Sequence, residues 1–255
     1  MINFTEMKFR IVYWVVNKLD KQKKLHFMNF GYTDADKILP LDDADETNRY
    51  CIQLYQHLAD LADLRNKDIV EIGSGRGGGL AFIAKNNSPN SLLGIDLSKS
   101  AIAFSNKHHK SGNLYFQRGD AQKLPLKNNS YDVVLNVESS HRYPEMDRFL
   151  SEVVRILKKG GHFLFTDFRY DHEWAELHEL FKLYSLKILF ELDITQNVVK
   201  ALEMDDQRRR NLVKELAPRY MQNAMLNFSG AVGSETYNYF CDRKYVYKSY
   251  VFQKI

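Results

Sequence analysis

The chain has 255 residues, a formal net charge of +4 and an apolar fraction of 44%. That length fits one large α/β domain or one domain with appended cap elements. The small charge gives no electrostatic case for a nucleic-acid partner, and no apolar run is long enough for stable insertion into a membrane. Two cysteines far apart in the chain, Cys51 and Cys241, indicate reduced thiols in a cytoplasmic protein.

The amino-terminal part of the chain predicts helices before any strand. Residues 6–19 carry apolar side chains near helical spacing. A second helix is expected over about 47–61, with Asp43 or Asp45 as its cap. Residues 1–62 are therefore expected to form N-terminal helices and a lid.

From Lys67 onward, short apolar runs alternate with segments of helical spacing. Strands are expected at residues 68–73, 91–98, 113–120, 131–139 and 162–168, and helices at 80–86, 99–109 and 146–157. Strands that alternate with helices indicate a parallel, doubly wound sheet. The sequence therefore predicts the α/β class.

After Phe168 the alternation becomes less regular. The pattern predicts a helix at 174–184, a strand at 186–194, a helix at 196–216, a glycine-bearing loop at 227–240 and a final strand at 244–255. No internal repeat or linker marks a second independent domain.

A glycine-rich stretch, EIGSGRGGG, follows the first expected strand at residues 71–79. It contains G-x-G-x-x-G, a spacing that often places backbone amides at a helix N-terminus against a pyrophosphate. Asp96 ends the second expected strand and suits the ribose hydroxyls of any adenosine-containing ligand. The glycines and Asp96 alone therefore leave a nicotinamide-dependent oxidoreductase open.

Two further features favour a different ligand. Glu71 stands two residues before the first glycine, where a carboxylate is a poor neighbour for a pyrophosphate and a good one for the methionine end of S-adenosylmethionine. Asp120 and Ala121 follow the third expected strand, where a carboxylate can accept a hydrogen bond from an adenine amino group. Both features disfavour an oxidoreductase that binds NAD.

Taken in order, the motifs over residues 67–168 resemble those of the class I S-adenosylmethionine-dependent methyltransferases. The resemblance implies a seven-stranded, mostly parallel, Rossmann-like sheet whose last strand is antiparallel, with helical N-terminal and C-terminal cap elements. It also implies a methyltransferase core over 63–255, with a substrate-cap insertion around 171–240. S-adenosyl-L-methionine is the cofactor that this resemblance implies.

The same resemblance assigns cofactor contacts residue by residue. Glu71, Gly73 and Gly75 match the motif at the methionine moiety. Asp96 matches the ribose-binding acid, Leu97 lies beside the adenine, and Asp120 with Ala121 match the adenine-binding pair. Asn136, at the end of the fourth expected strand, is expected to offer its backbone carbonyl to the amino group of the ligand.

The flanking segments MNFGY, ILPL, VESSHRYP and TDFR resemble a narrower group. Its members are O-methyltransferases of phthiotriolone-type lipid polyketides and related natural-product and sugar O-methyltransferases. This resemblance implies a small-molecule acceptor with a hydroxyl group. It does not name that acceptor, and the oligomeric state stays open.

Transfer to a hydroxyl benefits from a nearby base, because an alcohol is not ionised near neutral pH. His141 follows the fourth expected strand, and its ordinary pKa suits that role. Asp167 ends the fifth, so the two strand tips should meet and Asp167 should hold the histidine tautomer. A helix cap at His141 and an ion pair at Asp167 are the structural alternatives. His172 is a second candidate base, and no obligate metal is expected.

Three other functions remain as alternatives. A C-methyltransferase acting on a sterol- or quinone-like molecule would use an acid or an aromatic cage rather than a histidine base. An oxidoreductase that binds NAD is disfavoured by Glu71 and Asp120. A catalytically idle binding module is disfavoured because Glu71, Asp96 and Asp120 are all present.

Overall fold

The structure is a computed structural model that describes residue 20 and residues 24–34, 37 and 39–255. The helix expected at 6–19 lies outside these residues. The strands are β1 (Asp68–Ile72), β2 (Ser91–Asp96), β3 (Leu114–Arg118), β4 (Tyr131–Val137), β5 (Leu157–Tyr170), β6 (Leu186–Asp193) and β7 (Tyr245–Lys254). The helices are α2 (Asp43–Glu46), α3 (Arg49–Ala59), α4 (Gly78–Asn86), α5 (Lys99–His108), α6 (Met146–Ile156), α7 (Glu173–Lys182), α8 (Thr195–Leu216), α9 (Gln222–Phe228) and α10 (Glu235–Cys241), with 3-10 turns η1 (Ser140–Arg142) and η2 (Arg219–Met221).

Within this described part of the chain, the strands form a seven-stranded sheet in the order β3-β2-β1-β4-β5-β7-β6. Neighbouring strands from β3 to β5 pair in parallel, whereas β7 runs antiparallel to both β5 and β6. This arrangement confirms the expected doubly wound, mostly parallel sheet. The strand order reverses between β1 and β4, and in such sheets the ligand crevice lies outside the carboxyl ends of the strands at that point.

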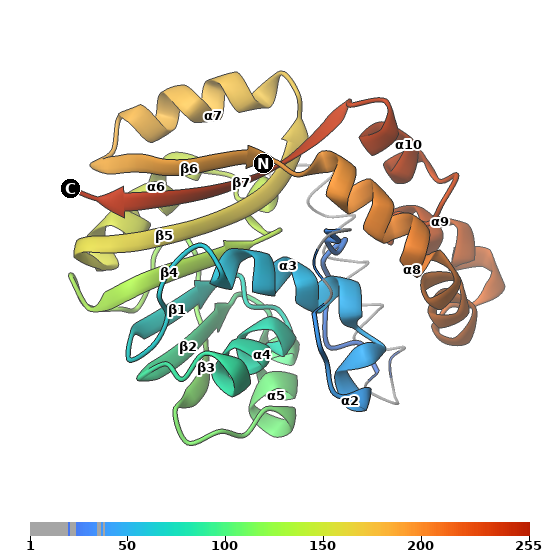
Figure 1. The fold of residues 1–255 in the computed structure, drawn as a ribbon, viewed down its shortest axis with the longest axis horizontal. Coiled ribbons are helices and arrows are strands. Elements are labelled where there is room, and N and C mark those ends of the chain that lie inside the picture. The colour runs from blue at the N-terminus through green and yellow to red at the C-terminus, as the bar shows by residue number, and fades with distance from the viewer. Residues whose placement is uncertain (1–19, 21–23, 35–36, 38) are drawn as a thin grey trace.

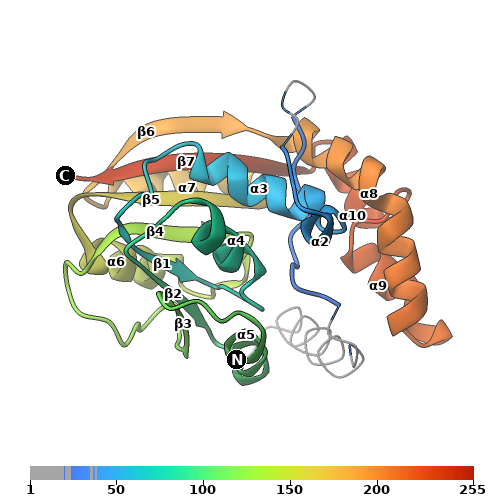
Figure 2. The same ribbon diagram turned by 60° about the horizontal axis from the view of Figure 1, so that its bottom comes forward.

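Two helical layers cover the sheet. Helices α3, α4 and α5 lie on one face, and α6 and α7 lie on the other (Figure 1), a layering that remains visible when the molecule is turned (Figure 2). Along β1 the side chains alternate between the layers: Ile69 packs with the α3 side, and Val70 and Ile72 pack with the α6 side. Glu71 therefore points toward α3.

Helix α6 shows why the spacing of apolar residues predicted a helix here. Phe149, Leu150, Val153 and Ile156 recur at helical spacing and are all fully buried against the sheet. Strand β5 begins directly after this helix, earlier than the expected residue 162. Its pairing with β4 shifts register between Tyr131 and Val133, so residues 158–161 form a bulge that contains the expected glycine turn.

Helices α8, α9 and α10 stand beyond the carboxyl ends of the parallel strands (Figure 1). The buried Arg209 of α8 connects these helices to the amino-terminal segment. Its guanidinium donates to the carbonyls of Phe30, at 2.9 Å, and Ser229, at 2.8 Å. It also pairs with Asp205 at 2.9 Å. The cap helices and residues 29–30 are therefore joined through one buried cation.

The loop expected at 227–240 was wrong in its second half. Helix α10 occupies Glu235–Cys241, and the side chain of Ser234 caps it by accepting from the Tyr237 amide. Only the turn between α9 and α10 is irregular, and there Gly230 and Gly233 have φ of +67° and +80°. Because of these glycines, the sequence predicted a loop that extends over residues that form α10.

The expected helix at 47–61 is confirmed as α3, but its expected caps were wrong. Asn48, not Asp43 or Asp45, precedes the first turn of α3. The two aspartates belong to the separate short helix α2, and Asp45 forms an ion pair with Lys85 at 2.9 Å.

Candidate active site

The glycine-rich turn between β1 and α4 bends tightly at the carboxyl end of β1. Gly73 has φ of +80°, and a Cβ placed there would lie 1.9 Å from Ser139 Oγ. Any larger residue would therefore collide with the segment after β4. Gly75 has φ of +53° with open space on its Cβ side, so its backbone is accessible to a ligand. The two glycines thus serve close packing and access respectively.

Asp96, at the end of β2, joins this turn to the start of α5. Its Oδ2 accepts the Gly75 amide at 2.8 Å, and its Oδ1 accepts the Ser98 amide at 2.8 Å. Burial raises the pKa of Asp96 above its ordinary value, although both backbone hydrogen bonds oppose that shift. Each carboxylate oxygen retains a second lone pair, so the side chain can also accept from ligand hydroxyls.

Glu71 is fully buried at the end of β1. Its Oε1 accepts a hydrogen bond from the Tyr55 hydroxyl at 2.7 Å, whereas its buried Oε2 has no hydrogen-bond partner among the residues that the structure describes. Burial raises the pKa of Glu71 to about 8. An unpartnered buried carboxyl oxygen is costly, and a ligand amine would satisfy it. Nothing in the sequence pattern of α3 singled out Tyr55.

The residues expected at an adenine lie around the tips of β2 and β3. Leu97, directly after β2, is 57% exposed. The Gly119 amide donates to the Asp96 carbonyl at 3.1 Å, which brings the two loops together. Asp120 Oδ1 accepts the Gln122 amide at 2.9 Å, and Ala121 packs against the α6-side core.

Asn136, near the end of β4, is fully buried. Its side-chain amide donates to the Ile72 carbonyl at 2.8 Å, to Tyr143 OH at 3.1 Å and to Ser139 Oγ at 3.2 Å. Ser139 and Tyr143 also hydrogen bond to each other. The side chain thereby fixes the β4 turn against the end of β1, a structural role that the sequence did not indicate.

His141 and Asp167 meet at the tips of the adjacent strands β4 and β5. His141 Nδ1 lies 2.7 Å from Asp167 Oδ1, and the His141 amide donates to Asp167 Oδ2 at 2.9 Å. Ser140 Oγ donates to the same Oδ2 at 2.6 Å and accepts from Arg169 at 2.8 Å. The aspartate therefore holds both the backbone and the ring of the histidine.

The surroundings of this pair favour a neutral imidazole beside an ionised carboxylate. Burial lowers the pKa of His141 below its ordinary 6.5, although Asp167 opposes the shift. Burial alone would raise the pKa of Asp167, but His141, Arg169 and the Ser140 hydroxyl together lower it to about 2. With Nδ1–H donating to the carboxylate, Nε2 is the nitrogen that carries a lone pair.

Arg142 donates a hydrogen bond to that nitrogen. Its Nε donates to His141 Nε2 at 3.0 Å, and its guanidinium stands 5.8 Å from the centroid of the Phe228 ring. The positive charge of Arg142 also lowers the pKa values of Asp96 and Glu138, against larger effects of burial. The motif VESSHRYP contains Arg142, but only the geometry shows that it contacts the imidazole.

Glu138 is a second acid in this region, outside the residues assigned to the cofactor or to catalysis. It has φ of +47°, a strained conformation for a non-glycine residue. Its Oε2 accepts the Phe30 amide at 2.8 Å and the Tyr247 hydroxyl at 3.0 Å. Burial raises its pKa to about 8. The second candidate base, His172, is exposed and stacks on Tyr170 just after the end of β5.

Among the described residues, no three histidine, cysteine or acidic side chains are grouped to hold a metal ion. The helices in the described ranges are too short or too polar for any of them to cross a membrane.

Comparisons with known proteins point to one chemistry. A family model described as a methyltransferase domain matches residues 70–165. The chain is 34% identical to a fatty-acid O-methyltransferase of Mycolicibacterium smegmatis, over 99% of this chain and 92% of that protein. It is 37% identical to a phthiotriol/phenolphthiotriol dimycocerosates methyltransferase of Mycobacterium tuberculosis, over 89% of this chain and 85% of that protein.

Solved structures share the fold at lower identity. The [4+2]-cyclase SpnF superposes with a TM-score of 0.73 at 20% identity, covering 95% of this chain and 93% of that one. A geranyl diphosphate C-methyltransferase from Streptomyces coelicolor A3(2) superposes with a TM-score of 0.71 at 14% identity, covering 96% and 97%. At these identities the likeness establishes the fold alone.

Proposed function

Because this chain belongs to the S-adenosylmethionine-dependent methyltransferase family, we propose that it methylates a hydroxyl oxygen of a lipid-, polyketide- or sugar-type small molecule. The hydrogen-bonded pair of His141 and Asp167 carries this proposal. The family membership also removes the NAD-dependent oxidoreductase from the alternatives.

The residues around the β1–β4 crevice suit the cofactor, which when bound supplies a methyl group on a sulfonium cation. We assign the unpartnered Oε2 of Glu71 to the amino group of its methionine end. Asp96 is assigned to the ribose hydroxyls, and the exposed Leu97 with Asp120 and Ala121 to the adenine. The open backbone at Gly75 lets the ligand approach the turn, and Asn136 borders the methionine end from β4.

His141 is proposed as the general base. The hydroxyl proton passes to Nε2, and the resulting imidazolium is stabilised by the carboxylate of Asp167 on Nδ1. Arg142 must move away from Nε2 first, because its Nε–H occupies that lone pair. Phe168 packs against the imidazole, with ring centroids 4.4 Å apart.

A second candidate acceptor is a carboxylate, and the contact between Arg142 and His141 favours it. A carboxylic acid is ionised near neutral pH, with a pKa of about 4 to 5, and needs no base. Its negative charge could pair with the guanidinium of Arg142 while that group stays near His141. The M. smegmatis relative is named for a fatty-acid substrate.

Matched acceptors distinguish the two cases. The purified protein is given methyl-labelled cofactor with a fatty alcohol or the fatty acid of the same chain length, and the product is identified by mass and by its ether or ester linkage. His141→Ala should lower the rate of ether formation by about 10²–10⁴-fold, because the alcohol keeps its proton, and should leave ester formation largely intact. Ether formation at the wild-type rate in His141→Ala would remove the base from the mechanism. A new carbon–carbon bond in the product would instead establish the C-methyltransferase alternative.

We further propose a cytoplasmic protein whose partner is a small molecule rather than nucleic acid. The formal charge of only +4 and the two free cysteines support this proposal. We assign residues 1–62 to N-terminal helices and a lid, and 63–255 to the catalytic core. The acceptor cap expected around 171–240 is best placed on α8–α10, because α7 and β6 cover or extend the sheet.

A further inference from the structure

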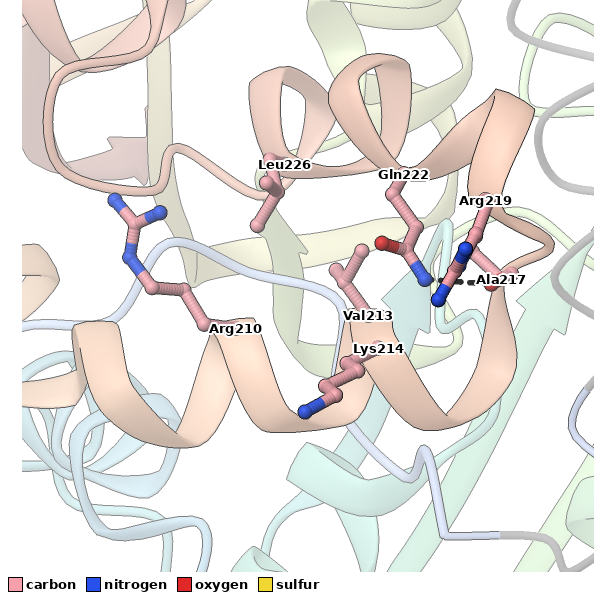
Figure 3. Close-up of a pocket in the computed structure, with 7 residues that line it drawn as sticks. All are labelled: Arg210, Val213, Lys214, Ala217, Arg219, Gln222 and Leu226. Carbon is pink, nitrogen blue, oxygen red and sulfur yellow. Dashed lines mark hydrogen bonds between the residues drawn. The ribbon is translucent and has the colours of Figure 1, made fainter.

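A cavity of about 570 Å³ opens between α8, η2 and α9, on the cap side of the molecule. Figure 3 shows three basic side chains on its walls, Arg210, Lys214 and Arg219. The apolar part of the lining comes from Val213, Ala217 and Leu226, and Gln222 completes it. The cavity thus combines positive charge with apolar surface.

Two of the three cations have their charge available. Lys214 and Arg219 are exposed, and neither side chain forms an ion pair or hydrogen bond with any residue that the structure describes. Arg210 is held by Asp206 at 2.7 Å and by the Val232 carbonyl at 2.6 Å. The nearest acid along the helix, Glu215, pairs with Lys24 at 2.6 Å. No acid in the lining opposes the basic groups.

The apolar part of the lining belongs to a small core. Val213 and Ala217 are each 6% exposed, and they cluster with Met225 and the partly buried Leu25. An apolar chain placed here would therefore continue an existing hydrophobic cluster. The lining includes none of the residues assigned to the cofactor or to methyl transfer. Helix α9 ends at Phe228, whose ring faces Arg142, so the cavity wall leads toward the acceptor side.

We propose that this cavity binds the anionic head group, carboxylate or phosphate, of a single-chain amphiphile. Lys214 and Arg219 hold the charge, Gln222 is placed for a hydrogen bond, and Val213, Ala217 and Leu226 contact the first part of the chain. The proposal concerns binding alone and does not depend on which atom the enzyme methylates.

Calorimetry on the full-length protein tests it without turnover. Dodecanoate, dodecyl phosphate and dodecanol are titrated below their aggregation concentrations, with S-adenosylhomocysteine saturating. We expect both anions to bind at least about tenfold more tightly than dodecanol, since charge-assisted contacts are stronger than neutral ones. Equal affinity for dodecanol would overturn the proposal, as would inorganic phosphate binding as tightly as dodecyl phosphate.

A charge-reversed pair separates this cavity from the crevice. Lys214→Glu/Arg219→Glu should weaken dodecanoate and dodecyl phosphate at least about tenfold. The control, Lys187→Glu/Lys200→Glu, makes the same change of net charge at exposed residues outside the cavity and should leave the affinity unchanged. Both proteins should bind S-adenosylhomocysteine as the parent does, which shows that they are folded. Equal weakening in both variants would mean a general charge effect and would overturn the site.

Vesicles identify the source of the head group. Sedimentation with phosphatidylglycerol vesicles and with phosphatidylcholine vesicles reports on binding to a lipid surface. If the protein binds the monomeric amphiphiles but does not sediment with vesicles, the ligand of the cavity is a free amphiphile. Sedimentation with the anionic vesicles that is lost only in Lys214→Glu/Arg219→Glu assigns it to a membrane head group. Vesicle binding that persists in that variant, with no monomeric binding, would overturn the proposal.

Discussion

The hydroxyl of Tyr55 donates a 2.7 Å hydrogen bond to Glu71 inside the protein, joining α3 to the end of β1. Within the described part of the chain, only one carboxyl oxygen of Glu71 has a hydrogen-bond partner, and burial raises the pKa of this group to about 8. The free protein therefore keeps Glu71 largely protonated at neutral pH. A cationic amine placed at the other oxygen would reverse that preference.

Cofactor binding near pH 7 should accordingly release protons. The amine favours the ionised form of Glu71, so its pKa falls on binding and up to about one proton leaves the protein. Calorimetry in buffers of different ionisation enthalpy measures this release. Glu71→Gln should bind the cofactor with the release largely lost, and an unchanged release in that variant would assign the proton to another group.

The stability that Glu71 and Glu138 give the free protein should fall as the pH rises from about 4.5 to about 8 and should level off above that. The pKa values of Glu71 and Glu138 are about 8 when folded and near the ordinary 4.5 when unfolded. Between these values the native state binds more protons, so the stabilising contribution is complete below 4.5 and is lost as pH rises through 8. Thermal unfolding between pH 6 and 9 measures it. The Glu71→Gln/Glu138→Gln protein should have a flatter curve, and a parallel curve would contradict the assignment.

Asp96→Ala should weaken S-adenosylmethionine by about ten- to 150-fold, from about 1.5–3 kcal/mol for hydrogen bonds to a charged group. The same change removes the acceptor of the Gly75 and Ser98 amides. Asp96→Asn keeps one acceptor oxygen and should lose less. Calorimetry compares the three proteins, with thermal unfolding as the folding control. Unchanged affinity in a folded Asp96→Ala protein would refute the ribose assignment.

His141→Ala should lower turnover of a hydroxyl acceptor by about 10²–10⁴-fold while leaving cofactor affinity nearly unchanged. Asp167→Asn should lose activity in the same direction, because it no longer accepts fully from Nδ1–H and Ser140. The double variant should lose less than the product of the two single losses, since the pair acts as a unit. Multiplicative losses would show that the residues act independently.

Residues 27–39 and 215–235 should become more protected when the cofactor product binds. Closure of these segments over the crevice would exclude water during transfer. Hydrogen exchange with and without S-adenosylhomocysteine measures the change, with β7 as an internal reference. Protection that is already complete in the free protein would rule out a mobile lid.

The sheet was predictable because its signals are local. The residues expected to contact the cofactor, such as Asp96 and Asp120, lie at the end of a recognisable strand or two residues after one. Even the meeting of His141 with Asp167 could be expected, because β4 and β5 are adjacent and parallel, with Val137 opposite Thr166. Parallel neighbours end at the same edge of a sheet.

The remaining contacts depend on how helices and side chains settle in three dimensions. Tyr55 reaches Glu71 only because α3 crosses the sheet at that point. Arg142 reaches His141 Nε2 through a side-chain conformation that no spacing specifies. The helix α10 was missed because the glycines before it resemble a longer loop.

The buried Arg209 has a consequence for engineering this enzyme. Its guanidinium binds carbonyls of Phe30 and Ser229, which lie almost two hundred positions apart in the chain. In a chimera that exchanges only the cap helices with a relative, a foreign α8 would pack against the native amino-terminal segment. The hydrogen bonds between that segment and the buried cation would then no longer be matched. Successful recombination should therefore transfer both ends of the chain together, so that acceptor preference is inherited as a two-part module.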